Sequence, residues 1–86
     1  MKITPKTFLK ELKKALEFDI SGDWDGAHSI VQQIDSPFSY RIHAYLHRKE
    51  GDLGNAQYWY KRAGTSAPCC SLEGEWKILM NLTEGL

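Results

Sequence analysis

The sequence predicts an all-α fold, in which two helical hairpins stack and a C-terminal helix closes the stack. The run Gly-Asp-x-x-x-Ala occurs twice, at residues 22–27 and 51–56. Each copy lies between two stretches whose apolar residues recur three and four positions apart, the pattern of two helices that meet at a corner. We therefore expect one helical-repeat domain over residues 1–86. Its hairpins should cover about 5–34 and 37–64, and its last helix about 72–84.

The first hairpin is expected to begin at Pro5, because proline suits the first turn of a helix. Apolar residues then recur at helical spacing up to about residue 18, namely Phe8, Leu9, Leu12, Ala15 and Leu16. Gly22 ends this helix, and the carboxylate of Asp23 can accept hydrogen bonds from the free amides of the next one. The second helix carries an apolar stripe over residues 24–34 and should end before Asp35-Ser36-Pro37.

The second hairpin is expected to pack its first helix on two sides. Over residues 38–49, apolar and aromatic residues occupy two faces of the predicted helix. Gly51 can take the left-handed conformation that ends a helix, and Asp52 can cap the next one. That fourth helix places Ala56, Trp59, Tyr60 and Ala63 on one side. Residues 64–70 then form a loop, and helical periodicity resumes at Leu72.

Residues 35–68 resemble one tetratricopeptide repeat. The residues that carry this resemblance are Ala44, Gly51, Asp52, Ala56, Tyr60, Ala63 and Pro68. Residues 6–34 resemble the same repeat more loosely. The resemblance implies a right-handed stack of hairpins and a role in binding proteins or peptides. The runs at 43–52 and 55–60 also resemble a family of small uncharacterised proteins, to which no activity is attached.

Composition argues against several function classes. Eleven basic and eleven acidic residues cancel, so the chain has no net charge that would attract a nucleic acid. No stretch is apolar and long enough to cross a bilayer, and no apolar leader is present, which predicts a cytoplasmic protein without membrane contact. The only two cysteines, Cys69 and Cys70, are adjacent and do not indicate a disulfide framework. We expect no cofactor.

Five arginine and tyrosine side chains are candidates for partner binding, because a planar guanidinium and a rigid amphipathic ring are frequent anchors at interfaces. Arg41, Tyr45 and Arg48 share the side of the third helix that would face a groove. Tyr58 and Arg62 lie opposite the packed face of the fourth helix and should be exposed or belong to a second interface.

A structural role for Arg48 is the alternative interpretation. Its guanidinium would then pair with Glu50, with Asp52 or with an acidic residue of the first helix. The sequence favours this ion pair over a partner contact.

His43 and His47 form the only arrangement typical of a metal or small-ligand site. They lie four residues apart on one helical face, Glu50 follows one turn later, and His28 can approach from the second helix. Alanine follows His43 where a metalloprotease would have glutamate, which argues against a zinc hydrolase of that type. The alternative is a pair of interior histidines hydrogen-bonded to tyrosine hydroxyls, and this structural interpretation is favoured.

The sequence therefore predicts a small interaction module for a protein or peptide, without catalytic activity of its own. It contains no phosphate-binding glycine loop, nucleophile elbow or Cys-His pair at a useful spacing. The alternatives are a metal- or small-ligand-binding protein centred on His43 and His47, and a protein whose exposed surface serves self-association.

Overall fold

Five helices make up the part of the chain that the structure describes. The computed structural model describes residues 5–84, with side chains from residue 8 onward. The helices are α1 (Pro5–Ile20), α2 (Trp24–Val31), α3 (Pro37–Glu50), α4 (Leu53–Arg62) and α5 (Leu72–Glu84). No strand occurs within residues 5–84, so the predicted all-α class is confirmed. The predicted domain also included residues 1–4 and 85–86, which lie outside the described residues.

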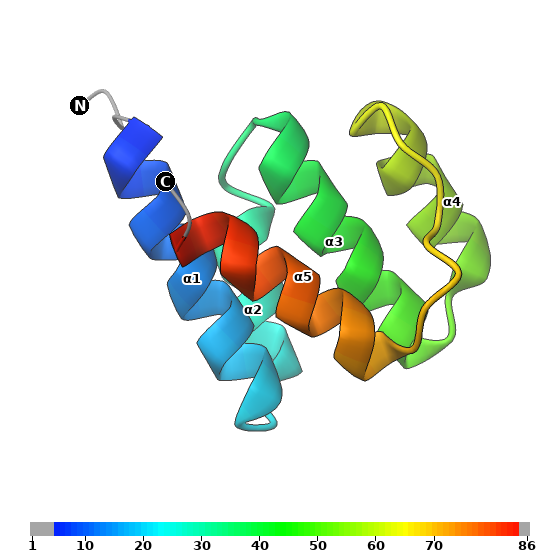
Figure 1. The fold of residues 1–86 in the computed structure, drawn as a ribbon, viewed down its shortest axis with the longest axis horizontal. Coiled ribbons are helices and arrows are strands. Elements are labelled where there is room, and N and C mark those ends of the chain that lie inside the picture. Colours follow the sequence, from blue (N-terminus) through cyan, green and yellow to red (C-terminus); the bar gives the residue numbers. More distant parts are fainter. Residues whose placement is uncertain (1–4, 85–86) are drawn as a thin grey trace.

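The helices pack as two successive pairs with α5 laid across them (Figure 1). α1 packs along α2, α3 packs along α4, and a contact between α2 and α3 joins the pairs. α5 contacts α1 and α3 and therefore covers the middle of the molecule. The tetratricopeptide-like stacking of the two pairs remains a prediction. Among the described residues, none of the helices combines the length and the apolar character needed to span a membrane.

The two Gly-Asp corners end one helix and begin the next. Gly22 and Gly51 have φ values of 97° and 88°, the left-handed conformation that glycine adopts readily. The carboxylate of Asp23 accepts a hydrogen bond from the amide of Gly26 at 2.9 Å. Asp52 is the N-cap of α4 in the same way. Both aspartates are therefore helix caps, as predicted.

Replacing the first cap is expected to destabilise the protein modestly. Asp23→Ala should lower the free energy of unfolding by about 1 kcal/mol, because the amide of Gly26 loses its acceptor. Urea denaturation followed by circular dichroism measures this change. Asp25→Ala removes an equal charge from the same turn of α2 and should cost less. Equal losses in the two variants would show that charge, and not the cap, stabilises this turn.

The second helix ends three residues earlier than predicted. α2 stops at Val31, and the apolar stripe continues to Ile34 through a turn. The amides of Gln33 and Ile34 bond to carbonyls three residues back, which tightens the chain beyond the α-helical pattern. Ile34 is nevertheless buried. The hydrophobic pattern therefore identified a core residue correctly and misplaced the helix end.

The main core lies between α1, α2, α3 and α5. Its buried residues are Leu12, Ala15, Leu16, Ala27, Val31, Ile34, Ile42, Tyr45, Leu46 and Leu79. On the opposite side of α3, a smaller cluster joins Ala44 of α3 to Ala56 and Tyr60 of α4. The two alanines are small enough for the helices to approach closely. α3 is thus buried on both faces, which confirms the prediction made for residues 38–49.

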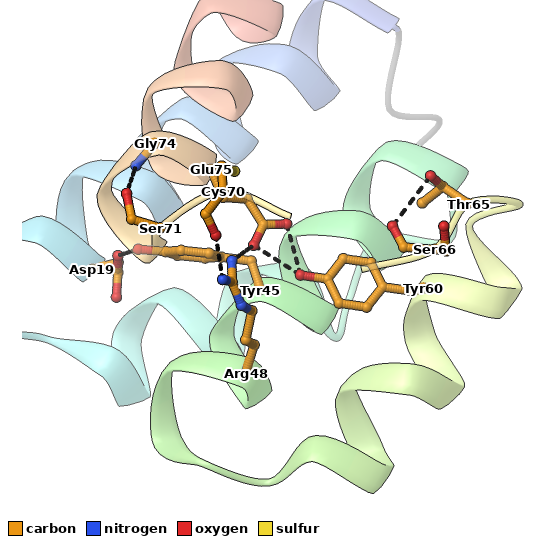
Figure 2. Close-up of polar contacts among 10 residues, drawn as sticks. All are labelled: Asp19, Tyr45, Arg48, Tyr60, Thr65, Ser66, Cys70, Ser71, Gly74 and Glu75. Carbon is orange, nitrogen blue, oxygen red and sulfur yellow. Dashed lines mark hydrogen bonds and ion pairs between the residues drawn. The ribbon is translucent and has the colours of Figure 1, made fainter. Parts of the chain in front are cut away.

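Two buried carboxylates join the helices around α3 (Figure 2). Glu75 of α5 is completely buried and accepts hydrogen bonds from Arg48 Nη1 at 2.8 Å and from the Tyr60 hydroxyl at 2.7 and 2.8 Å. Asp19 of α1 is also buried and accepts from the Tyr45 hydroxyl and from Lys49 Nζ, both at 2.9 Å. Each carboxylate therefore has a cationic partner and a tyrosine donor from neighbouring helices, as burial of a charge requires.

Candidate metal centre

Three imidazoles meet where α2 packs against α3. His43 and His47 lie on successive turns of α3, and His28 faces them from α2. Their candidate ligand nitrogens all lie within 4.8 Å of one another. The prediction that His28 approaches the two histidines of the third helix is therefore confirmed. The four-residue spacing accounts for the pair on α3, because residues i and i+4 share one face of a helix.

Two of the ring nitrogens are in direct contact. His28 Nε2 lies 3.1 Å from His43 Nε2, a hydrogen-bond distance. One of these nitrogens must carry the proton and the other must accept it through its lone pair. The His47 ring packs beside that of His43, with centroids 4.9 Å apart. At least one imidazole lone pair is consequently directed into the cluster.

Glu50 orients the third imidazole. His47 Nδ1 donates a hydrogen bond to Glu50 Oε2 at 2.5 Å. This contact places the proton of a neutral His47 ring on Nδ1 and leaves the Nε2 lone pair free. The carboxylates of Glu50 and Asp52 form a group with His47 but not with the other two histidines. Glu50 is thus positioned to orient the His47 ring. It is not one of the three side chains that could bind a metal in the histidine cluster.

Two tryptophan rings enclose the histidines. Trp24 of α2 stacks on His28 with centroids 4.8 Å apart and an interplanar angle of 11°. Trp59 of α4 stacks on His43 at 4.0 Å and 14°. The Nε1–H of Trp24 is already used, since it donates to the Leu46 carbonyl oxygen. Trp24 lies one turn before His28, a spacing that places the two side chains on the same face of a helix. The sequence pattern alone indicates only that Trp24 belongs to an apolar stripe, so the stack on His28 was missed.

Burial disfavours the charged forms of His28 and His43. His43 and His47 are only 5% and 6% exposed, whereas His28 is partly exposed. Desolvation lowers the pKa of His43 to about 4, and the neighbouring charges of His28 and His47 act in the same direction. Desolvation and His47 also lower the pKa of His28, while Glu50 and Asp25 oppose this shift. At pH 7 the His43 imidazole is therefore neutral, the form that binds metals.

The predicted link between the histidines and tyrosine hydroxyls is wrong. The hydroxyls of Tyr45 and Tyr60 donate to buried carboxylates instead. Those carboxylates are Asp19 of α1 and Glu75 of α5. The partners of the histidines are one another, a glutamate and two indoles.

The groove predicted along α3 does not include Tyr45 and Arg48. Tyr45 is 2% exposed and belongs to the core. Arg48 donates to Glu75 and, through Nη2, to the carbonyl oxygen of Cys70. The structural ion pair expected for Arg48 therefore exists, but its partner lies on α5 and not in the turn or on the first helix.

The other three candidates for partner binding remain at the surface or beside a cavity. Arg41 lines a pocket at the beginning of α3. Tyr58 is 54% exposed. The guanidinium of Arg62 lies 4.7, 5.2 and 5.8 Å from the ring centroids of Tyr40, Trp59 and Tyr58. Tyr58 and Arg62 thus lie on the outer side of α4, as predicted.

Comparison with known proteins finds no match to this chain among models of protein families, curated proteins or solved structures.

Proposed function

We propose that the protein binds one divalent transition-metal ion through His28, His43 and His47. The observation that carries this proposal is the approach of three imidazole nitrogens to within 4.8 Å of one another. Three histidines from two packed helices form a donor set within reach of a single ion, and His47 would have to move closer to the other two. Metal binding was the alternative function expected from the sequence. The position of His28 beside His43 and His47 now favours it over the interaction module.

The distance between the first two ligands fits a single ion. With Zn–N bonds of about 2.0–2.1 Å, two nitrogens bound to one tetrahedral zinc lie about 3.3 Å apart. The observed separation of His28 Nε2 and His43 Nε2 is 3.1 Å. A metal ion can therefore replace the proton that these two nitrogens share, with only a small outward movement of the rings.

The contact between His47 and Glu50 supports the same proposal. Histidine ligands usually donate their second N–H to a carboxylate or a carbonyl, which fixes the ring and makes it a better ligand. His47 Nδ1 donates to Glu50 at 2.5 Å in this way. Imidazole donors suit zinc, copper and nickel better than magnesium or calcium, which prefer oxygen. We expect zinc, with copper and nickel as competitors.

Metal analysis of tag-free protein tests the proposal. Protein dialysed against zinc at pH 7.5 and then freed of excess metal should retain about one ion per chain, measured by mass spectrometry of the elements. His28→Ala should weaken binding by more than about 100-fold, because loss of an outer partner alone costs about 10–100-fold. Glu50→Gln should fall within that smaller range, since it removes the outer partner and no ligand.

The chain has three histidines and all belong to the cluster, so the control is an exposed acid remote from it, Glu73 on α5. Glu73→Gln should bind zinc as the parent does. A parent protein that retains no metal, or a His28→Ala variant that binds as tightly as the parent, would overturn the proposal and leave the histidines a structural cluster.

Protein or peptide binding is a second candidate function. It is favoured by the outer side of α4, where Tyr58 is exposed and Arg62 is stacked among three rings. Arginine and tyrosine are frequent anchors of interfaces. The absence of catalytic activity, a cytoplasmic location and the tetratricopeptide-like stacking also remain proposals, supported by the sequence patterns described above.

A further inference from the structure

An arginine of α3 lines a small apolar pocket that is separate from the histidine cluster. The pocket has a volume of about 280 Å³ and is lined by Pro37, Phe38, Arg41, Ala63, Thr65 and Leu82. It therefore lies where the beginning of α3, the end of α4 and the end of α5 come together. Apolar side chains form most of its wall, and Arg41 supplies the only charged group.

Arg41 lacks the partners that the other buried polar groups have. Its Nε atom is shielded from water and has no hydrogen-bond partner, and it is the one buried side-chain nitrogen or oxygen in this state among the described residues. None of the ion pairs in that part of the chain includes Arg41. A buried donor without an acceptor is unfavourable, and such groups are rare in native proteins. The pocket thus has a cation that forms no ion pair with an acid among the described residues.

We propose that this pocket binds the C-terminal end of a peptide whose last side chain is aliphatic. A carboxylate can engage the Nε edge of a guanidinium through two parallel hydrogen bonds. At a peptide terminus the carboxylate and the side chain leave the same carbon atom, so one small pocket can hold both. The volume is slightly below the range usual for complete small-molecule ligands, which fits one end of a longer chain.

Binding requires a rotation of the Arg41 side chain. Its Nε–H is shielded in the free protein, so the guanidinium must turn before this edge meets the carboxylate. Leu82 of α5 is 40% exposed and can cover the aliphatic side chain of the peptide. This pocket gives the predicted partner-binding role of Arg41 a definite chemistry, and it does not depend on metal binding.

Nuclear magnetic resonance of ¹⁵N-labelled protein can observe the Nε–H of Arg41 directly, with its signal assigned by its loss in Arg41→Lys. The probe is acetyl-Gly-Gly-Leu with a free carboxylate. We expect this peptide to shift the Arg41 signal and the backbone signals of the pocket. The same peptide with a C-terminal amide should bind at least about tenfold more weakly, because it lacks the charged acceptor.

Variants separate recognition by Arg41 from general charge attraction. Arg41→Lys keeps the charge but removes Nε, and it should weaken binding at least about tenfold. Leu82→Glu places an acid at the exposed wall of the pocket and should also weaken binding. Lys61→Gln removes a charge from the same end of α4 without changing the lining, and should leave binding within about twofold. Unchanged backbone signals elsewhere verify that each variant is folded.

Four results would overturn the proposal. They are the absence of any shift with the free acid, equal binding of acid and amide, unchanged binding in Arg41→Lys, and binding of 4-methylpentanoate as tight as that of the peptide. The last result would assign the pocket to a free carboxylic acid and not to a peptide.

Discussion

Arg48→Met is expected to lower the free energy of unfolding by about 3–5 kcal/mol, because it leaves the charge of Glu75 buried without its cationic partner. Glu75 is 0% exposed, and Arg48 Nη1 lies 2.8 Å from its Oε1. The Tyr60 hydroxyl would remain as a donor, but a neutral group compensates a buried carboxylate less well than a guanidinium. The same substitution frees the carbonyl oxygen of Cys70, which precedes α5.

A double-variant cycle separates the ion pair from the packing of the Arg48 stem. Glu75→Gln retains an acceptor for Tyr60 and removes the charge. In the Glu75→Gln background, Arg48→Met should cost clearly less than it does in the parent, measured by denaturant titration. Arg62→Met, on the exposed arginine of α4, should change stability by no more than about 0.5 kcal/mol. Equal costs of Arg48→Met in both backgrounds would show that Glu75 and Arg48 are not coupled.

Local chemistry explains why the helices could be predicted from the sequence. Gly51 and Asp52 together determine one corner through their conformation and hydrogen bonding, so the end of α3 and the beginning of α4 follow from two adjacent residues. The end of α2 was predicted less well. Ile34 is buried in a turn, and hydrophobic periodicity reports burial without distinguishing a helix from a tight turn that continues it.

The candidate site was predictable only where its residues share a helix. The spacing of His43 and His47 and the position of Glu50 follow from helical geometry. The placement of His28 needed the packing of α2 on α3, for which the Gly-Asp repeat gave some basis. Trp59 reaches His43 from α4, and nothing in its spacing relates it to a histidine on another helix.

The burial of Asp19 and Glu75 could not be predicted from the sequence. Asp19 and Glu75 have no local feature that separates them from solvent-exposed acids on amphipathic helices. Their partners are distant in the sequence, since Tyr45 lies 26 residues from Asp19 and Arg48 lies 27 residues from Glu75, with one whole helix between the members of each pair. For this reason the sequence places Tyr45 beside a groove and predicts an acid of the turn or of the first helix as the partner of Arg48. The packing of both α1 and α5 against α3 provides the internal partners that the structure shows.

Metal-free protein is expected to lose up to about 3 kcal/mol of unfolding free energy through His43 as the pH falls from 6.5 to 4. Burial lowers the pKa of His43 to about 4, from an ordinary value of 6.5 that the unfolded chain should retain. Between these values the unfolded chain binds more protons than the folded one. The stability from His43 is therefore complete above pH 6.5 and decreases until the pH reaches the folded-state pKa.

The pH dependence of His43→Gln isolates this contribution from those of the other titrating groups. The titratable groups that face His43 are His28 from α2 and His47 from its own helix. Glu50 lies on the far side of His47 and is hydrogen-bonded to it. Carboxylates also titrate below pH 5, so the informative quantity is the difference in slope between parent and variant. Denaturant titrations in the presence of a chelator should give a parent curve that falls more steeply from pH 6.5 to 4 than that of His43→Gln. Parallel curves would mean that the folded protein protonates His43 at its ordinary pKa, and that the imidazole cluster accommodates a positive charge without opening.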